Sequence, residues 1–346
     1  MRRKKENSLS STIYDIASAA NVSIATVSRV FNNSTSVSPK TKKRILDVAT
    51  SMGYHPKAFA QGLARKNSKM IMILVPVISN YFFMEVLAGI QDKLLEYDYD
   101  LNIYNLNSNQ ANRNLKDQIE YIMSRGMADG YLLVSVHQKE IQWETLKNFE
   151  NPVILIDEFH QEFDSVSVDS VEGSYLATQH LLNQGYEKIT LISANPNSKP
   201  MRDRKIGFKR ALEDAGKMLN EDQIIVSEDL YRDGFSEENG YKAMIELMKK
   251  YPETEAVVCA SDIQALGALK AMKDIHVRVP IIGFDDIPMS KFLGLSTMRQ
   301  PMYEMGTLAL EKLFDRIQNK DKLISHTVFS PELVVRESSF LLPMSI

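Results

Sequence analysis

A short stretch near the amino terminus combines small side chains, hydroxyls and one arginine at a spacing suited to nucleic-acid contact. In a helix that begins after Ser23, the outward-facing positions hold Ile24, Ala25, Ser28 and Arg29. Small residues at the start of such a helix allow a close approach to base edges, and an arginine can bind guanine through two hydrogen bonds. These side chains are therefore suited to recognise bases in the major groove of DNA.

Hydroxyl groups at nearby helix starts suit contacts to the phosphate backbone. Thr12, Ser38 and Thr41 lie where helices are expected to begin, and hydroxyls or free amides at such places bind phosphate oxygens. Basic side chains follow in the last of these helices, namely Lys40, Lys42, Lys43 and Arg44. A lysine run at a helix start is often only solvated, so the alternative is an ordinary three-helix bundle with a basic surface.

Charge is divided unevenly along the 346-residue chain. Residues 1–69 carry 13 Lys and Arg against 3 Asp and Glu, a net of +10, whereas residues 70–346 carry 28 against 41, a net of −13. Such asymmetry indicates contact with nucleic acid or a membrane at the basic end. The longest apolar run, Met70–Ile78, has nine residues and is too short to cross a bilayer. We therefore expect nucleic acid as the partner, with no membrane contact.

Local patterns predict three short helices within residues 11–55. Apolar spacing predicts the first from Thr12. Ser23 is suited to cap the second, and Ser38-Pro39 supplies a cap and a first-turn proline for the third. The order of these elements and the short turn between the first two are typical of a helix-turn-helix.

A fourth, shorter stretch separates this region from the rest of the chain. Residues 57–66 have a helical pattern, but Gly62 weakens it by about 1 kcal/mol relative to alanine. Isolated helices this short are marginal in water. We therefore expect residues 56–68 to form a linker that is only conditionally ordered.

From Met70 onwards, apolar runs of strand length alternate with amphipathic helical stretches. The expected strands are Met70–Val77, Asp100–Leu106, Gly130–Val136, Val153–Asp157, Lys188–Ser193, Ala256–Ala260 and Ile281–Phe284. The expected helices begin near Phe83, Asn112, Ser170, Asp203, Glu237, Ile263 and Tyr303. Repeated units of this kind predict parallel sheets covered on both faces. Residues 70–346 exceed one such sheet, so we expect two doubly wound lobes with a ligand cleft between them.

Composition argues against several classes of protein. The single cysteine, Cys259, excludes internal disulfides and cysteine-rich zinc modules and indicates a reducing compartment. The six histidines lack metal-ligand spacing, and we find neither a nucleophile elbow nor a phosphate-binding glycine loop. We therefore expect a cytoplasmic protein without catalytic residues, metal or cofactor.

A solute-binding protein for transport is the second class that the α/β core alone would permit. The basic residues 2–5 could begin a signal peptide, but the polar residues 6–8 follow where an apolar stretch is required. That observation and the helix-turn-helix both argue against a transport role.

The segment from Thr12 to Leu63 resembles the headpiece of the lactose/galactose-repressor family of transcription regulators. The matching motifs are Val22-Ser23-x-x-Thr26-Val27-Ser28-Arg29-Val30-x-Asn32, Val37-Ser38-x-x-Thr41, Gly53-Tyr54-x-Pro56 and Ala60-x-x-Leu63-Ala64. The resemblance implies a DNA-binding headpiece over residues 11–55 and a hinge helix within residues 56–68. By position, Leu63 would be the leucine that wedges into the central base step, and Ala60 would let two paired hinges approach.

The resemblance also implies a homodimer on a pseudo-palindromic operator of double-stranded DNA, acting as a repressor of carbohydrate metabolism genes under the control of a small effector. The implied DNA contacts are Thr12, Ser23, Ile24, Ala25, Ser28, Arg29, Asn32, Ser38, Thr41, Tyr54, Ala60 and Leu63.

Residues 70–346 resemble the family's effector-binding and dimerisation core, which is itself similar to periplasmic sugar-binding proteins. The motifs include Phe82-Phe83-x-Glu85, Asp129-Gly130, Arg204-x-x-Gly207-Phe208, Gly283-Phe284-Asp285-Asp286 and Gln300-Pro301. The resemblance implies an N-lobe of about residues 70–168 and 298–328 and a C-lobe of about residues 169–297 and 329–346. The candidate effector contacts are Phe82, Phe83, Asp157, Arg204, Phe235, Ser261 and Asp285.

These candidates suit a sugar or a sugar phosphate. Arg204, expected at the start of a helix, could hold a carboxylate, a phosphate or sugar hydroxyls, and Asp285 could accept hydrogen bonds from hydroxyls. The phenylalanines could instead be ordinary core residues, and Arg204 with Asp285 could be a structural ion pair. Ser261 stands where several relatives carry asparagine, which weakens any transfer of ligand identity.

A catabolite-control branch of the family is the alternative reading. That branch takes a phosphorylated carrier protein as co-repressor, and residues 295–301 look partly like it.

Overall fold

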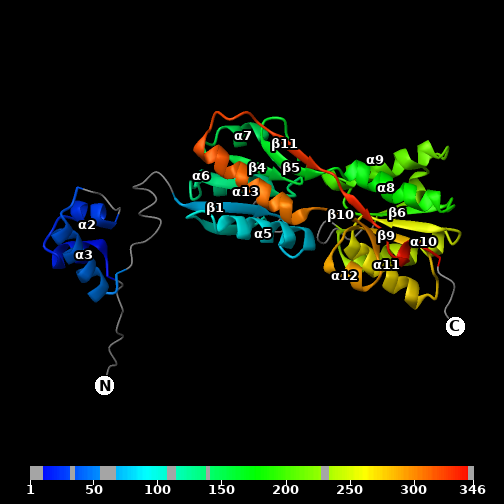
Figure 1. Ribbon diagram of the computed structural model, residues 1–346, viewed down its shortest axis with the longest axis horizontal. Coiled ribbons are helices and arrows are strands. Elements are labelled where there is room, and N and C mark those ends of the chain that lie inside the picture. Colours follow the sequence, from blue (N-terminus) through cyan, green and yellow to red (C-terminus); the bar gives the residue numbers. More distant parts are fainter. Residues whose placement is uncertain are drawn as a thin grey trace, which may run out of the picture. The chain divides into compact units, whose positions relative to one another are not determined.

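The computed structural model describes residues 11–31, 36–54, 68–106, 114–137, 141–226 and 234–341 (Figure 1). It divides into two compact units. The first comprises the chain up to Met70 together with Gly126–Asp129, and the second comprises Ile71–Arg125 together with Gly130–Ile346. None of the helices in the described ranges is long and apolar enough to cross a membrane.

Three helices pack around a small apolar core in the first unit. They are α1 (Ile13–Ala19), α2 (Ile24–Phe31) and α3 (Pro39–Ser51). Ile16, Val27 and Ile45 are buried where the helices meet, and Tyr54 packs against this core after α3. The helices lie where the sequence predicts them.

Side-chain caps explain why these short helices begin where they do. Thr12 caps α1 in a capping box, because its hydroxyl accepts from the amide of Asp15 at 3.4 Å while its own amide donates to the carboxylate of Asp15 at 2.8 Å. Ser38 caps α3 by accepting from the amide of Thr41, and Pro39 occupies the first turn. Local signals of this kind need no tertiary context, so the sequence alone locates the helix starts.

The N-lobe of the second unit is built on a sheet of six described strands in the order β11-β5-β4-β3-β1-β2. The strands are β1 (Met70–Val75), β2 (Asp100–Asn105), β3 (Gly130–Val134), β4 (Val153–Ile156), β5 (Asp164–Val168) and β11 (His326–Phe329). The strand pairs β1–β3, β3–β4, β4–β5 and β5–β11 are all parallel.

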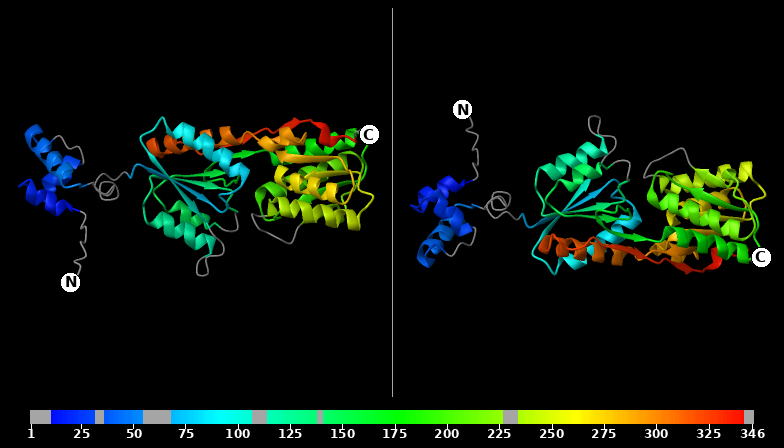
Figure 2. Two further views of the ribbon diagram at one scale, coloured as in Figure 1. Left: turned by 90° about the horizontal axis from the view of Figure 1, so that it is seen from below. Right: turned by 90° about the horizontal axis from the view of Figure 1, so that it is seen from above.

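Helices cover both faces of this sheet. The covering helices are α5 (Tyr81–Leu94), α6 (Leu115–Ser124), α7 (Trp143–Lys147) and α13 (Met302–Gln318). Figure 2 shows α5 and α13 together on one face and α6 and α7 on the other. The helices α5 and α13 approach closely because Gly306 faces Val86, where an added Cβ would come within 2.0 Å of the Val86 carbonyl oxygen.

The C-lobe repeats this arrangement with the strand order β12-β10-β9-β8-β6-β7. Its strands are β6 (Ile189–Ser193), β7 (Ile224–Val226), β8 (Ala256–Cys259), β9 (Ile281–Asp285), β10 (Ser296–Arg299) and β12 (Glu332–Val334). Its helices are α8 (Ser170–Asn183), α9 (Lys199–Asp214), α10 (Glu237–Lys250), α11 (Asp262–Asp274) and the short α12 (Pro288–Phe292). The edge strand β12 is antiparallel to β10, whereas the pairs β10–β9, β9–β8, β8–β6 and β6–β7 are parallel.

The chain passes between the lobes three times within the described residues. It crosses between β5 and α8, between β10 and α13, and between β11 and β12. The strand β10 belongs to the C-lobe sheet, so the second crossing follows Arg299. Short strands such as β10 and β12 lack a long apolar run, and their place in the sheet depends on tertiary pairing.

The structure corrects the sequence prediction at two elements of the core, the start of α9 and the strand β5. The helix predicted to begin near Asp203 begins at Lys199, because Ser198 caps it and Pro200 lies in its first turn. The strand β5 was not predicted, because its sequence alternates polar and apolar residues although every position is buried. Its polar side chains are accommodated by hydrogen bonds that only the folded chain supplies.

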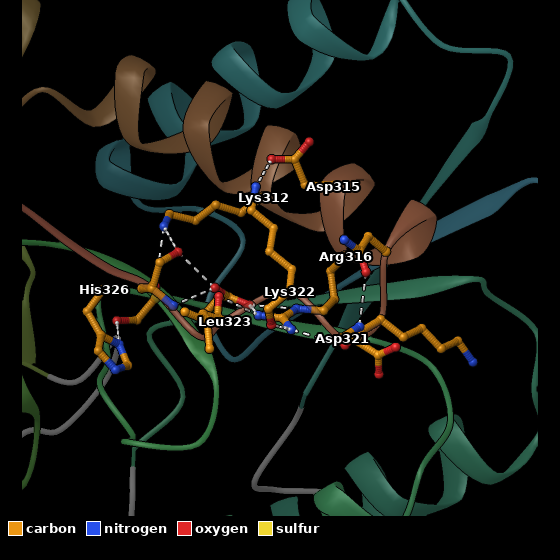
Figure 3. Close-up of polar contacts among 12 residues, drawn as sticks. Lys312, Asp315, Arg316, Asp321, Lys322, Leu323 and His326 are labelled. Atoms are coloured by element: carbon orange, nitrogen blue, oxygen red, sulfur yellow. Dashed lines mark hydrogen bonds and ion pairs between the residues drawn. The ribbon is translucent and has the colours of Figure 1, made fainter.

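One such network holds the connection between α13 and β11 (Figure 3). The Arg316 guanidinium donates from Nη2 and Nε to Asp164 Oδ2 at 2.6 and 3.0 Å, and it also contacts backbone carbonyls of residues 320, 322 and 323. The other oxygen of Asp164 accepts from the amide and hydroxyl of Ser325, both at 2.9 Å. Asp164 thus anchors the start of β11 beside the start of β5.

Candidate DNA-binding face and inter-lobe pocket

The outer face of α2 is exposed as base contact requires. Ser23, Ile24, Ala25 and Arg29 are exposed, with 42% of Ile24 accessible, whereas Ser28 is half-buried. Ser23 accepts a hydrogen bond from the amide of Thr26, which starts the helix. The exposed side chains of the first turn are small or apolar, so Arg29 is the long polar side chain available on this face.

The phosphate-contact candidates lie at helix starts. Thr12 and Ser38 are exposed caps, and Thr41 is half-buried in the first turn of α3. The basic side chains of α2 and α3 have no ion-pair partner among the described residues; they are Arg29, Lys40, Lys42, Lys43 and Arg44. Their charge is therefore available to DNA phosphates.

Tyr54 closes the headpiece against α2. Its ring lies 5.5 Å from the Phe31 ring, centroid to centroid, and is half-buried. Burial raises the pKa of its phenol. The remaining DNA-contact candidates, Asn32, Ala60 and Leu63, lie outside the described residues.

All seven predicted effector contacts line one pocket in the second unit, between the two lobes. The predicted lining residues are Phe82, Phe83, Asp157, Arg204, Phe235, Ser261 and Asp285. The N-lobe contributes the carboxyl ends of β1, β3 and β4, and the C-lobe contributes the start of α9 and the carboxyl ends of β8 and β9. The position agrees with the rule that ligands bind beyond the carboxyl ends of parallel strands.

Backbone strain is concentrated at these strand ends. Ser135, Asp157, Asp285 and Asp286 all have positive φ, at 49°, 62°, 131° and 59°. Such conformations cost about 1–3 kcal/mol each for residues other than glycine and persist where surrounding contacts hold them. The strain is evidence that the fold presents these side chains in a particular direction.

Hydrogen bonds and ion pairs hold the strained turn after β9. Gln300 Nε2 donates to Asp285 Oδ1 at 2.6 Å. Asp286 is paired with Arg336 at 2.7 Å and with Arg299 at 2.8 Å. The buried Asp262 carboxylate accepts from the amide of residue 287 and from two hydroxyls, at 2.5–3.0 Å. Asp285 therefore lines the pocket from a turn whose side chains are held by hydrogen bonds and ion pairs.

Arg204 provides a buried donor at the pocket wall. It lies in the second turn of α9, and only 4% of its surface is exposed. Its guanidinium stacks on Phe284 with 3.7 Å from Cζ to the ring centroid, and Nη1 donates to the carbonyl of Ala260. Nε has no hydrogen-bond partner among the described residues. A buried donor without an acceptor costs about 1–3 kcal/mol, which a ligand oxygen would remove.

In the pocket, Asp157, Arg204 and Asp285 each affect the pKa of the others. Burial raises the pKa of Asp157 to about 6 and the pKa of Asp285 to about 8, although the nearby positive charge of Arg204 opposes both shifts. Burial likewise lowers the pKa of the Arg204 guanidinium, against the effect of the two carboxylates. Hydroxyl donors from a ligand would stabilise the ionised carboxylates.

The remaining predicted contacts have structural duties as well. Phe83 is fully buried in the N-lobe core, Phe82 packs partly buried against that core, and Phe235 packs against a small cluster beside Ala260. Ser261 caps α11, and its hydroxyl accepts from the amide of Gln264 at 3.3 Å. Its position at the pocket therefore follows from helix capping.

Sequence reasoning omitted several polar residues that line the pocket. They include Asn80, Ser135, His137, Glu158, Glu237 and Gln300. Asn80 had a usable signal, since it caps α5 immediately before the phenylalanines by accepting from the amide of Phe83 at 2.7 Å. The Oε1 atom of Gln300 is buried without a partner among the described residues, so Gln300 can accept from a ligand while its Nε2 donates to Asp285.

Two family profiles match the chain. Residues 12–57 match "Bacterial regulatory proteins, lacI family", and residues 178–339 match "Periplasmic binding protein-like domain". The "HTH-type transcriptional regulator RegA" of Clostridium saccharobutylicum is 31% identical, over 96% of this chain and 100% of that protein. The chain belongs to the lacI family of bacterial regulatory proteins.

Other relatives agree with this assignment. The "HTH-type transcriptional repressor PurR" of Mannheimia succiniciproducens is 32% identical, over 94% of this chain and 98% of that protein. The structure of a LacI-family regulator from Enterococcus faecium with bound ribose is 26% identical, with a TM-score of 0.68, over 79% of this chain and 100% of that chain. This lacI-family protein is thus a DNA-binding transcription regulator with a headpiece and a two-lobed α/β core, as the sequence predicted.

Proposed function

We propose that this lacI-family protein is a homodimeric repressor whose operator affinity changes when an uncharged sugar binds between the lobes. The observation that carries the proposal is the pocket itself. It places an unpartnered Arg204 Nε beside the buried carboxylates of Asp157 and Asp285, with Phe82 and Phe235 in the same lining. Carboxylates accept from sugar hydroxyls, the guanidinium donates to them, and aromatic faces suit the apolar C–H surfaces of a sugar ring.

Electrostatics favours a neutral sugar over a sugar phosphate. The lining contains four acidic side chains, those of Asp157, Glu158, Glu237 and Asp285, against the single guanidinium of Arg204. The pKa of about 8 favours a protonated Asp285 near neutral pH, but three acidic side chains still face one cation. A phosphate group would bring up to two further negative charges into partly buried surroundings, where like charges repel strongly. The ribose seen in the Enterococcus faecium regulator is an uncharged sugar of the kind expected.

A thermal-shift screen with the full chain tests the ligand class. The panel contains free sugars, the phosphate esters of the same sugars, and nucleosides. We expect one or more free sugars to raise the melting temperature and to bind at least ~10-fold more tightly than their phosphate esters. Tighter binding of a phosphate ester, or of a nucleoside, contradicts the neutral-sugar assignment.

The same sugar is then tested for its effect on DNA binding. Duplexes selected by the protein from a random-sequence pool provide the DNA, and purified protein is used without any carrier protein. A change in duplex affinity on adding the sugar supports the proposal. A change that requires a phosphorylated carrier protein instead supports the catabolite-control alternative.

We expect a homodimer because one headpiece can read only one half-site of an operator. One helix-turn-helix reads one half-site, so a pseudo-palindromic operator needs two headpieces related by a two-fold axis. We expect two chains on each selected duplex, measured by sedimentation of the complex, and a half-site arrangement with two-fold symmetry in the selected sequences.

The linker leucine is expected to contribute to specific DNA binding. Leu63→Ala should lower affinity for the selected duplex by about tenfold, because an apolar wedge opens a base step and is repaid by added contacts. Affinity for an unrelated duplex should remain unchanged, since that binding depends on phosphate contacts. Gln61→Ala serves as the matched linker control, and an equal loss in both variants would contradict a wedge.

A further inference from the structure

The carboxylate of Asp129 accepts three hydrogen bonds from the chain just before β1. Its Oδ1 atom accepts from the amide and the hydroxyl of Ser68 at 2.7 and 2.8 Å, and its Oδ2 atom accepts from the amide of Lys69 at 3.0 Å. These groups are only partly buried, so the arrangement is not a consequence of core packing. We call the three residues the Asp129 clamp.

The backbone at Ser68 and Lys69 is shaped to hold a carboxylate. Lys69 has a positive φ of 54°, which turns two successive amides toward the same anion. A left-handed conformation costs a lysine about 1–2 kcal/mol, and hydrogen bonds to a charged carboxylate offset that cost. The Ser68 hydroxyl also accepts from the amide of Met70 at 3.3 Å, which ties the clamp to the first residue of β1.

Asp129 is itself held at the amino ends of two interior strands of the sheet. It follows the turn at Gly126 (φ 58°) and directly precedes β3, and its amide donates to the carbonyl of Met70 at 2.8 Å. Because β1 and β3 are parallel neighbours with Ile71 opposite Gly130, the clamp joins the amino ends of two adjacent strands. Asp164 does the same for the starts of β5 and β11 through its hydrogen bonds with Ser325, but it anchors a connection between two elements of the N-lobe.

We propose that Asp129 is a positioning residue for DNA binding, which fixes the direction of the chain at Ser68 and Lys69 and thereby connects the N-lobe to the linker. The residues immediately before Ser68 are those assigned to the linker, including Leu63, so the clamp acts on the chain at the point where the described part of the N-lobe begins. Without it, Ser68 and Lys69 can rotate, and a change in the N-lobe no longer sets where the linker begins. The inference rests on the proposed operator binding.

Asp129→Asn is the sharpest test, since it keeps the shape and removes the acceptor set. An asparagine presents one oxygen and one NH2 group, so a donor would face a backbone amide and at least one bond is lost. Asp100→Asn is the matched control, because Asp100 is exposed, begins another strand of the same sheet and loses the same charge. Ser68→Ala removes only the hydroxyl and provides a milder variant.

Four measurements are made on the full chain. Hydrogen exchange of the Ser68 and Lys69 amides should be at least ~10-fold faster in Asp129→Asn than in the parent and in Asp100→Asn. Affinity for the selected duplex should fall by about tenfold in Asp129→Asn, with a smaller loss in Ser68→Ala. The melting temperature and the sugar affinity should match those of Asp100→Asn.

Faster exchange with unchanged duplex affinity would overturn the proposal, since the clamp would then be local to the strand end. So would a loss of affinity accompanied by an equal loss of sugar binding and melting temperature, which indicates general destabilisation. Failure of the parent protein to select any duplex would instead refute the proposed operator binding, and the exchange result would still report on the clamp itself.

Discussion

Replacing Arg204 by lysine is expected to weaken sugar binding about a hundredfold in a protein that still folds and still binds the selected duplex. The guanidinium has three tasks at once: it stacks on Phe284, donates from Nη1 to the carbonyl of Ala260, and holds a further donor, Nε, buried at the pocket wall without a partner among the described residues. A lysine ammonium is a point charge without a planar face, so it cannot perform all three. Loss of the charge-assisted hydrogen bond from Nε to the ligand, at up to about 3 kcal/mol, corresponds to a factor of about 100.

Lysine keeps the positive charge that the carboxylates of Asp157 and Asp285 require, so the buried cluster is not left with an uncompensated charge. Sugar affinity is measured by titration calorimetry with the sugar identified in the thermal-shift screen. Arg202→Lys is the control, because Arg202 lies on the same helix outside the pocket, where its guanidinium donates to the carbonyl of Asn197. Sugar binding by Arg204→Lys within threefold of the parent would remove Arg204 from the ligand site.

Replacing Arg29 by alanine is expected to abolish the preference for one base in each half-site. Arg29 is exposed on the face of α2 that carries small residues, and it has no ion pair among the described residues. A bidentate contact to guanine contributes about 1–3 kcal/mol of discrimination, or roughly 5- to 150-fold in relative affinity. Competition between the selected duplex and its single-base variants measures this preference.

Arg44→Ala separates base reading from simple charge. Arg44 is an exposed cation on α3 of the same headpiece. Both variants remove one positive charge, so both should reduce the dependence of affinity on salt by a similar amount. Only Arg29→Ala should flatten the base preference. If the two variants have the same effect on every duplex, Arg29 contacts phosphate and not a base.

The headpiece shows how far local sequence signals reach. Thr12 with Asp15, and Ser38 with Pro39, locate two helix starts through contacts spanning three residues or fewer. The apolar spacing then determines which face is buried, as at Ile16 and Val27. Such short-range signals are complete within the sequence, so the structure reproduces the predicted helices closely.

The core shows where local signals stop. Long apolar strands such as β1 and β3 were predicted, because strands buried on both faces are apolar along their whole length. The short strands β10 and β12 were not, and β5 hides polar positions in a buried strand. Each of these pairs with at least one strand more than thirty positions away, β5 with β11 and β10 with β12, so no short window of sequence contains the whole pairing.

By itself, the amino-acid sequence determined the class of the protein: a basic headpiece with exposed Arg29, followed by an acidic core of parallel strands with Asp157 and Asp285 at their ends. Charge, helix caps and apolar periodicity are properties of neighbouring residues, so they can be identified without knowledge of the fold. Tertiary structure decided which atoms remain available. In the folded chain, Arg204 Nη1 donates to the carbonyl of Ala260, and Nε has no partner among the described residues. The Ser261 hydroxyl caps a helix, and Asp129 accepts from the amide of Ser68. Those outcomes depend on hydrogen bonds between distant segments, which form only once the chain has folded.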